Sequence, residues 1–142
     1  MKLNVFVCAI DILELVQTQY SSNLSTHSYE CSYTGTCGLS NLYCEGIEIH
    51  TKEEGLYIIK SYSNMDLLGL IYEKDFILFD LEVNATKWDD DSHYNNQFKI
   101  TLYRQMNTSF ILVVTTSQDH EQGEFSITID GPSNVSMQIM RM

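Results

Sequence analysis

The hydrophobic pattern is clearest between Trp88 and Thr116, which reads WDDDSHYNNQFKITLYRQMNTSFILVVTT. Within this stretch, residues 98–103 alternate between apolar and polar side chains, and residues 110–114 are apolar throughout. Alternation with a period of two is typical of a strand that buries one face. A short, wholly apolar run is expected of a central strand that is covered on both faces. The stretch therefore predicts two neighbouring strands joined by a short polar turn.

The same pattern extends through most of the remaining chain. Short apolar or alternating segments recur at regular spacings, separated by turns rich in Gly, Asn and Asp. The further strands predicted in this way are Leu3–Val7, Glu45–His50, Leu56–Tyr62, Leu67–Tyr72, Phe76–Val83, Phe125–Asp130 and Val135–Ile139. Only residues 10–16 show an ambiguous helical period. The pattern predicts an all-β fold, an antiparallel β-sandwich or jelly roll of about eight strands.

Residues 1–20 are predicted as an N-terminal segment ahead of a single domain at residues 21–142. The segment continues from Lys2 with LNVFVCAI, which resembles a short signal peptide. Asp11 and Glu14 interrupt the apolar run and no typical cleavage site follows, so a retained strand is the alternative. Such a strand belongs either to its own domain or to a groove in a neighbouring copy, as in donor-strand assembly. The segment is too short and too charged to span a membrane.

Composition limits the class of partner. With 142 residues, 44% of them hydrophobic, the chain is long enough for one globular domain with a real core. Nineteen acidic residues against eight basic ones give a formal net charge of −11. That charge disfavours binding to nucleic acid or to anionic membranes. A negative charge of this size favours the binding of cations, or it serves only to keep the protein soluble.

Four cysteines occur, at Cys8, Cys31, Cys37 and Cys44, and the last three lie in the polar segment at residues 21–46. No C-x-x-C pair is present, and no histidine stands at zinc-ligand spacing, so disulfides are favoured over a zinc site. Two disulfides are predicted, with the three possible pairings left open. Residues 21–46 are therefore expected to form a loop stapled by cysteines, as in many secreted proteins.

Sequons for N-linked glycosylation also indicate a secreted protein. The four asparagines that begin an Asn-x-Ser/Thr triplet are Asn23, Asn84, Asn107 and Asn134. All four fall at predicted turns or strand ends, where a glycan can be attached. The sequence therefore predicts a secreted, glycosylated protein.

Several short motifs of the chain resemble the pre-peptidase C-terminal domain, a small jelly-roll accessory module of secreted proteins. In chain order they are Gly55–Tyr57, Asp66 before Leu70–Tyr72, Asp89–Asp91, Phe110–Val114 and Gly123–Ile129. The ending at residues 125–135 is also similar to uncharacterised secreted eukaryotic proteins with the same sandwich. The resemblance covers about residues 45–136 and departs at residues 92–94 and 105–107, where glycines are usual. It implies binding or adhesion without catalysis.

The resemblance also implies a calcium site, because some relatives hold calcium in the loop that corresponds to Asp89, Asp90 and Asp91. Calcium prefers six to eight oxygen ligands, which these carboxylates, Asn95, Asn96 and backbone carbonyls could supply. The spacing is not that of an EF-hand, and successive side chains point in different directions. The alternative is a solvated acidic turn at the end of a strand.

Other chemistry is harder to find in the sequence. The histidines are scattered along the chain, at His27, His50, His93 and His120, and none of the common catalytic motifs is present. The aromatic residues considered for stacking on a sugar ring are Trp88 with Tyr94, and Tyr29, Tyr33 and Tyr43 in the cysteine segment. Packing beneath the loops is their alternative role. The chain is therefore expected not to be an enzyme.

Together these features predict an extracellular structural or adhesive module. Its most concrete form is a homopolymer, a filament or surface layer, in which residues 1–16 contribute a strand to the next copy. The alternative is an accessory module of a secreted protein that binds calcium or carbohydrate. No cofactor is expected unless the aspartate loop holds calcium.

Overall fold

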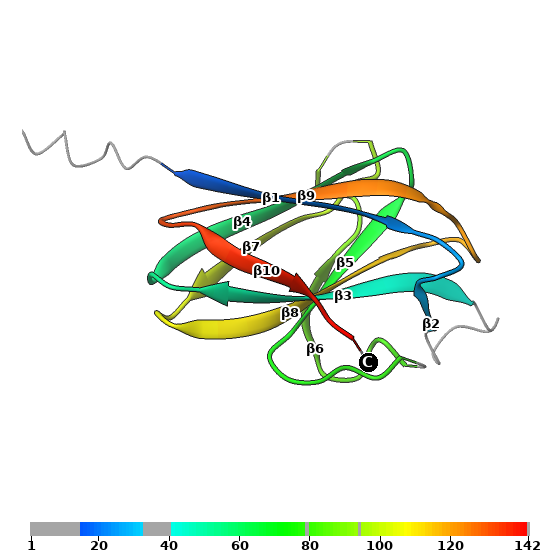
Figure 1. Cartoon of the computed structure of the whole chain (residues 1–142), viewed down its shortest axis with the longest axis horizontal. Helices are drawn as coiled ribbons and strands as arrows, with labels where there is room; N and C mark the ends of the chain where they lie inside the picture. Colours follow the sequence, from blue (N-terminus) through cyan, green and yellow to red (C-terminus); the bar gives the residue numbers. More distant parts are fainter. Residues whose placement is uncertain (1–14, 33–40, 79, 94, 142) are drawn as a thin grey trace, which may run out of the picture.

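The computed structural model describes residues 15–32, 41–78, 80–93 and 95–141, and this part of the chain is all-β (Figure 1). Ten strands form two antiparallel sheets that face each other as a β-sandwich. The four-stranded sheet has the order β1 (Val16–Leu24), β9 (Gly123–Gly131), β4 (Gly55–Ser63), β7 (Lys99–Arg104). The six-stranded sheet has the order β10 (Val135–Ile139), β3 (Leu42–Thr51), β8 (Thr108–Thr116), β5 (Leu67–Tyr72), β6 (Ala85–Asp89). The short β2 (Tyr29–Cys31) also pairs with β3.

The main core lies between the two sheets. Alternate residues of each strand point inward, as the period of two predicts, and they are almost completely buried. The four-stranded sheet contributes Tyr57, Ile59, Ile100, Phe125, Ile127 and Ile129, and the six-stranded sheet contributes Ile47, Ile49, Leu67, Ile71, Phe110, Leu112 and Val114. Gly69 of β5 lies under the ring of Phe98, where a Cβ atom would approach the ring to 2.7 Å. A side chain at that position would therefore displace a core aromatic.

A second hydrophobic cluster covers the outer face of the six-stranded sheet. It contains residues from β2, β3, β5 and β8 together with Leu81, and Phe76 and Leu78 pack against it. Because β8 is buried on both faces and lies between β3 and β5, the prediction of a central strand at residues 110–114 is confirmed. The second cluster also explains why β5 is apolar on both faces.

The predicted strand at Phe76–Val83 is wrong. The described residues of this segment form turns, with an isolated bridge between Ile77 and Asp80, and Tyr72 donates a hydrogen bond to the backbone carbonyl of Leu81. Its apolar side chains fold back over the sheet as a covering loop. A short apolar run has the same composition in a strand and in a covering loop, so periodicity could not distinguish the two.

The segment at residues 21–46 is also only partly a loop. It contains the end of β1, the whole of β2 and the beginning of β3. The described residues thus form ten strands where the pattern predicted about eight, and the predicted boundary between residues 20 and 21 falls inside β1. β1 reads VQTQYSSNL, and its less exposed positions mix apolar Val16 and Leu24 with Thr18, Tyr20 and Ser22, so the hydrophobic alternation is weak. The predicted strand at residues 3–7 lies outside the described residues.

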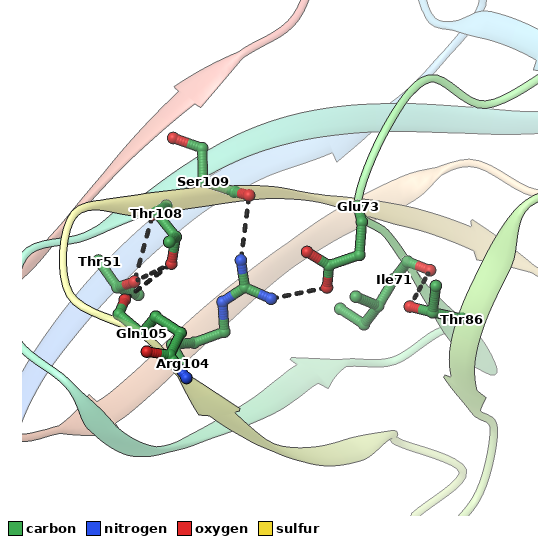
Figure 2. A network of polar contacts seen from close by, with 8 residues as sticks. All are labelled: Thr51, Ile71, Glu73, Thr86, Arg104, Gln105, Thr108 and Ser109. Carbon is green, nitrogen blue, oxygen red and sulfur yellow. Dashed lines mark hydrogen bonds and ion pairs between the residues drawn. The ribbon is translucent and has the colours of Figure 1, made fainter.

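Arg104 joins the two sheets at the end of β7 (Figure 2). Its guanidinium donates to the Glu73 carboxylate at 2.6 Å and to the Ser109 carbonyl at 3.1 Å. The same group lies 4.7 Å from the centre of the Phe110 ring. The side chain is nearly buried, with 9% exposed, so these contacts hold a charge inside the sandwich. Beside it, Thr51 and Thr108 share a hydrogen bond between neighbouring strands.

Candidate functional site

Antiparallel pairing of β5 with β6 assembles an acidic cluster of three residues, Asp66, Asp90 and Asp91. Asp66 immediately precedes β5, and Asp90 and Asp91 immediately follow β6. Because Gly69 pairs with Asp89, the beginning of one strand lies beside the end of the other. One carboxylate oxygen from each of the three aspartates lies within 4.8 Å of the other two. This is the one group of potential metal ligands found within the described residues.

Asp89, the first residue of the predicted calcium set, has another role. Its carboxylate accepts hydrogen bonds from the backbone N–H of Ser92 at 3.1 Å and from that of Lys99 at 2.8 Å. It also accepts one from the Ser92 hydroxyl at 2.5 Å. Asp89 therefore closes the turn after β6, as a solvated turn residue would. Asn95 and Asn96 continue the same loop in the left-handed region, with φ of 61° and 60°.

Two acidic residues outside the predicted calcium set, Asp66 and Glu121, belong to this surface. Asp66 accepts a hydrogen bond from the Ser117 hydroxyl at 3.1 Å. Glu121 lies near enough to Asp66 that burial first, and then this negative charge, raises the pKa of the Glu121 carboxyl. These residues come from different turns, so no local spacing links them with the aspartate run. Only the pairing of the strands could have found them.

The carboxylates of the acidic cluster repel one another. Burial, and then the charges of Asp66 and Asp91, raise the pKa of Asp90 from 3.8 to about 6. Three carboxylate oxygens are shielded from solvent and accept no hydrogen bond: Oδ1 of Asp66, Oδ1 of Asp90 and Oε1 of Glu121. A shielded acceptor without a donor is costly, and a hard cation satisfies several at once. The carboxylate oxygens of Asp66, Asp90 and Asp91 are thus of the type that calcium prefers as ligands.

Two of the four cysteines are described, and the structure brings them together. Cys31 on β2 and Cys44 on β3 are buried and lie 2.5 Å apart. No disulfide is assigned between them, so the predicted stapled loop is not confirmed. A hydrogen bond that the Cys44 thiol donates to Cys31, and then burial, raise the pKa of Cys44. A raised pKa disfavours the reactive thiolate. Cys8 and Cys37 lie outside the described residues.

All four sequon asparagines are exposed: Asn23, Asn84, Asn107 and Asn134. Asn84 and Asn107 also occupy the left-handed region in turns, with φ of 70° and 54°. Each side chain is therefore accessible to a glycosyltransferase. No helix in the described part of the chain is long and apolar enough to cross a membrane.

The aromatic residues considered for sugar binding divide into two groups. Trp88 on β6 is 65% exposed, whereas Tyr43 is buried in the main core and Tyr29 packs against the second cluster. Tyr33 and Tyr94 lie outside the described residues. Two exposed tyrosines that the sequence did not indicate, Tyr62 and Tyr103, lie on the outer face of the four-stranded sheet.

The histidines remain separate from the acidic cluster. His50 shares a hydrogen bond with Ser109 at 2.9 Å, and His120 contacts Glu30 at 3.2 Å. The rings of His93 and Tyr62 are in contact and nearly perpendicular, and His27 lies in the turn after β1. The residues that structure and sequence together single out are therefore carboxylates and exposed aromatics.

No protein-family model matches the sequence, and no curated protein is similar to it at a significant level. The fold class is therefore established from the strands and their pairing, as an antiparallel β-sandwich.

Proposed function

We propose that this chain is an extracellular, non-catalytic structural or adhesive module that assembles with further copies through β1. The observation that carries the proposal is the free edge of that strand. Among the described strands β1 pairs only with β9, and its nine residues keep one unbroken register from Val16 to Leu24. It contains no charged residue, no proline and no bulge. Natural proteins use such features to protect edges, so a regular edge without them suits the addition of a strand.

The other sheet edges have the protective features that β1 lacks. β7 carries Lys99 and Arg104, and β6 carries Lys87 and pairs through an irregular register. β10 is only five residues long. Charges, bulges and short length all oppose pairing with a second chain. The contrast favours β1 as the place where another strand is added.

Buried hydrogen bonds hold β1 in place against the opposite sheet. Glu45 of β3 is only 6% exposed, and its carboxylate accepts hydrogen bonds from the hydroxyls of Tyr20 and, at 2.8 Å, Ser22. Burial, and then this hydrogen bond, raise the pKa of Tyr20, which keeps it a donor. Thr18 accepts a hydrogen bond from the backbone of Val135 at 3.2 Å. A fixed edge loses less conformational entropy when it binds a strand.

The strand that β1 receives is, in this proposal, the segment at residues 1–14 of the next copy, in which residues 5–10 are all apolar. Head-to-tail addition of this kind does not close on itself, so it produces a filament or layer. The exposed sequons support an extracellular setting. The resemblance of residues 45–136 to jelly-roll accessory modules agrees with a role without catalysis, and we extend the fold to the jelly-roll type on that basis.

Deleting residues 1–14 tests this proposal. The full chain should sediment as polymers that electron microscopy can show, and the truncated chain should sediment as a monomer. A full-length variant with Leu3, Val5 and Val7 changed to Asn should behave like the truncated chain. Leu56→Asn removes an apolar side chain that is 58% exposed elsewhere on the same sheet, and it should leave the polymers intact. Polymers that persist after the deletion would show that another surface is responsible.

A peptide of residues 1–14 locates the receiving edge. Added to the truncated chain, it should slow amide hydrogen exchange in β1 and leave the opposite edge strand, β7, unchanged. Protection of β7 in place of β1, or no protection of either strand, would contradict the assignment of the edge.

The acidic cluster favours a second candidate function, the binding of calcium. The supporting observation is that the aspartates converge while shielded oxygens of Asp66 and Asp90 lack donors. Millimolar calcium should raise the melting temperature, since calcium at about 100 times its Kd adds about 2.7 kcal/mol to the stability of the fold. Asp66→Asn should abolish the shift, whereas Asp75→Asn, at an exposed turn outside the cluster, should not. An equal shift in both variants would show that any bound calcium lies elsewhere.

A further inference from the structure

The outer face of the four-stranded sheet carries an exposed aromatic side chain between two hollows. Ser21, Ser126 and Tyr62 form one row across β1, β9 and β4, because Ser126 pairs with both of the others. The Tyr62 side chain points away from the core and is 40% exposed. We propose that this face binds a neutral glycan, with one sugar ring stacked on Tyr62.

Both hollows share Tyr62 and Glu124. One has a volume of about 320 Å³ and is otherwise lined only by polar residues, among them Asn64, His93 and Asn95. The other has a volume of about 290 Å³ and extends over the row of serines towards Gln19. Together they form a shallow, polar surface on each side of one aromatic ring. A linear oligosaccharide fits such a surface better than a compact apolar ligand does.

The Tyr62 ring has a defined orientation. It makes an edge-to-face contact with His93, with ring centres 5.4 Å apart and an interplanar angle of 86°. An aromatic face fixed in this way offers apolar area to the C–H face of a sugar at little further loss of entropy. The polar tip of the ring remains available for a hydrogen bond with a hydroxyl group.

The polar groups around the ring have the chemistry of hydroxyl recognition. Glu124 presents an exposed carboxylate that can accept hydrogen bonds from two adjacent sugar hydroxyls. Gln19 and Asn64 each offer both a donor and an acceptor. The formal charge of −11 and the position of Glu124 oppose sulfated or uronate-rich glycans. The ligand class is therefore a neutral oligosaccharide.

This site goes beyond the assembly proposed above, since assembly uses the backbone edge of β1 and glycan binding uses the face of the sheet. It also differs from the aromatic positions that the sequence indicated. Trp88 is more exposed than Tyr62, but it lines neither of the two hollows beside Tyr62. Trp88 and Tyr103 therefore provide matched comparisons.

The test is an array of neutral oligosaccharides of glucose, mannose and N-acetylglucosamine, with sulfated and uronate oligosaccharides alongside, probed with the full chain. At least one neutral series should bind, and the charged ones should not. For the best neutral hexasaccharide, Tyr62→Ala should raise the Kd about tenfold or more, and Glu124→Gln severalfold. Tyr103→Ala and Trp88→Ala should leave the Kd within about twofold.

Ser126→Phe provides a second variant, which keeps Tyr62 but fills one hollow beside it, and it should cause a similar loss. All variants lie on the surface, so their melting temperatures should match that of the parent chain. Absence of binding to every neutral oligosaccharide would overturn the proposal. An equal loss in Tyr62→Ala and Trp88→Ala would also overturn it. Whether the chain polymerises in the same samples does not depend on either of these binding results.

Discussion

The carboxyl group of Asp90 lies against that of Asp66, although one residue follows β6 and the other precedes β5. The contact exists because β5 and β6 are antiparallel neighbours. It brings together like charges in a partly buried turn, and this is unfavourable unless a proton or a cation is present. The pKa of Asp90 rises accordingly, to about 6.

The first prediction concerns pH. The pKa of Asp90 is about 6 in the fold against 3.8 for the free group, so the folded chain binds this proton more tightly. The contribution of Asp90 to the free energy of unfolding should therefore decrease as pH rises from about 4 to about 6. Asp90→Asn should remove that decrease. At pH 7 it should stabilise the chain by on the order of 1 kcal/mol after allowance for solvent screening.

Urea unfolding of the parent chain and Asp90→Asn at several pH values measures this difference. Asp75→Asn is the matched control, because that aspartate lies at an exposed turn outside the cluster. A difference between parent and Asp90→Asn that stays constant from pH 4 to pH 7 would show that Asp90 has an ordinary pKa.

The second prediction concerns Cys31 and Cys44. Their positions on neighbouring strands favour a cross-link when the chain folds in an oxidising compartment. The two thiols would lose two protons and two electrons to a disulfide oxidant such as glutathione disulfide, which is reduced to two molecules of glutathione. Peptide mapping without reduction should find this pair joined. Changing both residues to Ser should lower the free energy of unfolding by about 2–3 kcal/mol. Pairing of either cysteine with Cys8 or Cys37 would contradict the prediction.

The third prediction concerns Glu45, which holds β1 through Tyr20 and Ser22. Glu45→Ala leaves two hydroxyls without their acceptor and should cost about 2 kcal/mol, because buried polar groups need partners. Amide exchange in β1 should accelerate more than exchange in the central strand β8. Glu48→Ala changes an exposed glutamate on the same strand, and its effect should stay within about 0.5 kcal/mol. Equal effects of both variants would show that the contact does not hold β1.

The fourth prediction concerns Arg104. Arg104→Ala removes the ion pair with Glu73, the hydrogen bond to Ser109 and the contact with the Phe110 ring. The variant should lose about 2–3 kcal/mol in thermal or urea unfolding, since its side chain is nearly buried. Glu73→Gln should cost less than about 1 kcal/mol because Glu73 is 47% exposed. Lys99→Ala, on the same strand but exposed, is the control and should change little.

The sequence pattern predicted most of the sandwich correctly. The strands expected at residues 56–62, 67–72, 98–103, 110–114 and 125–130 correspond to β4, β5, β7, β8 and β9. Burial of one face leaves a period of two in the sequence, and burial of both faces leaves a continuous apolar run. Where the less exposed face of a strand mixes polar with apolar residues, as in β1, the alternation is weak. Where an apolar loop covers a sheet, as at residues 76–78 and 80–83, the signal is misleading.

The sequence by itself therefore determined the class of the fold and named two of the three aspartates in the acidic cluster, because both are consequences of local composition. Tertiary structure alone decided that Asp66 joins Asp90 and Asp91, and that Tyr62 lies beside Ser126. The physical reason is that antiparallel pairing brings together residues far apart in the chain. Which side chains meet is set by the register between strands, and no local pattern in the sequence records that register.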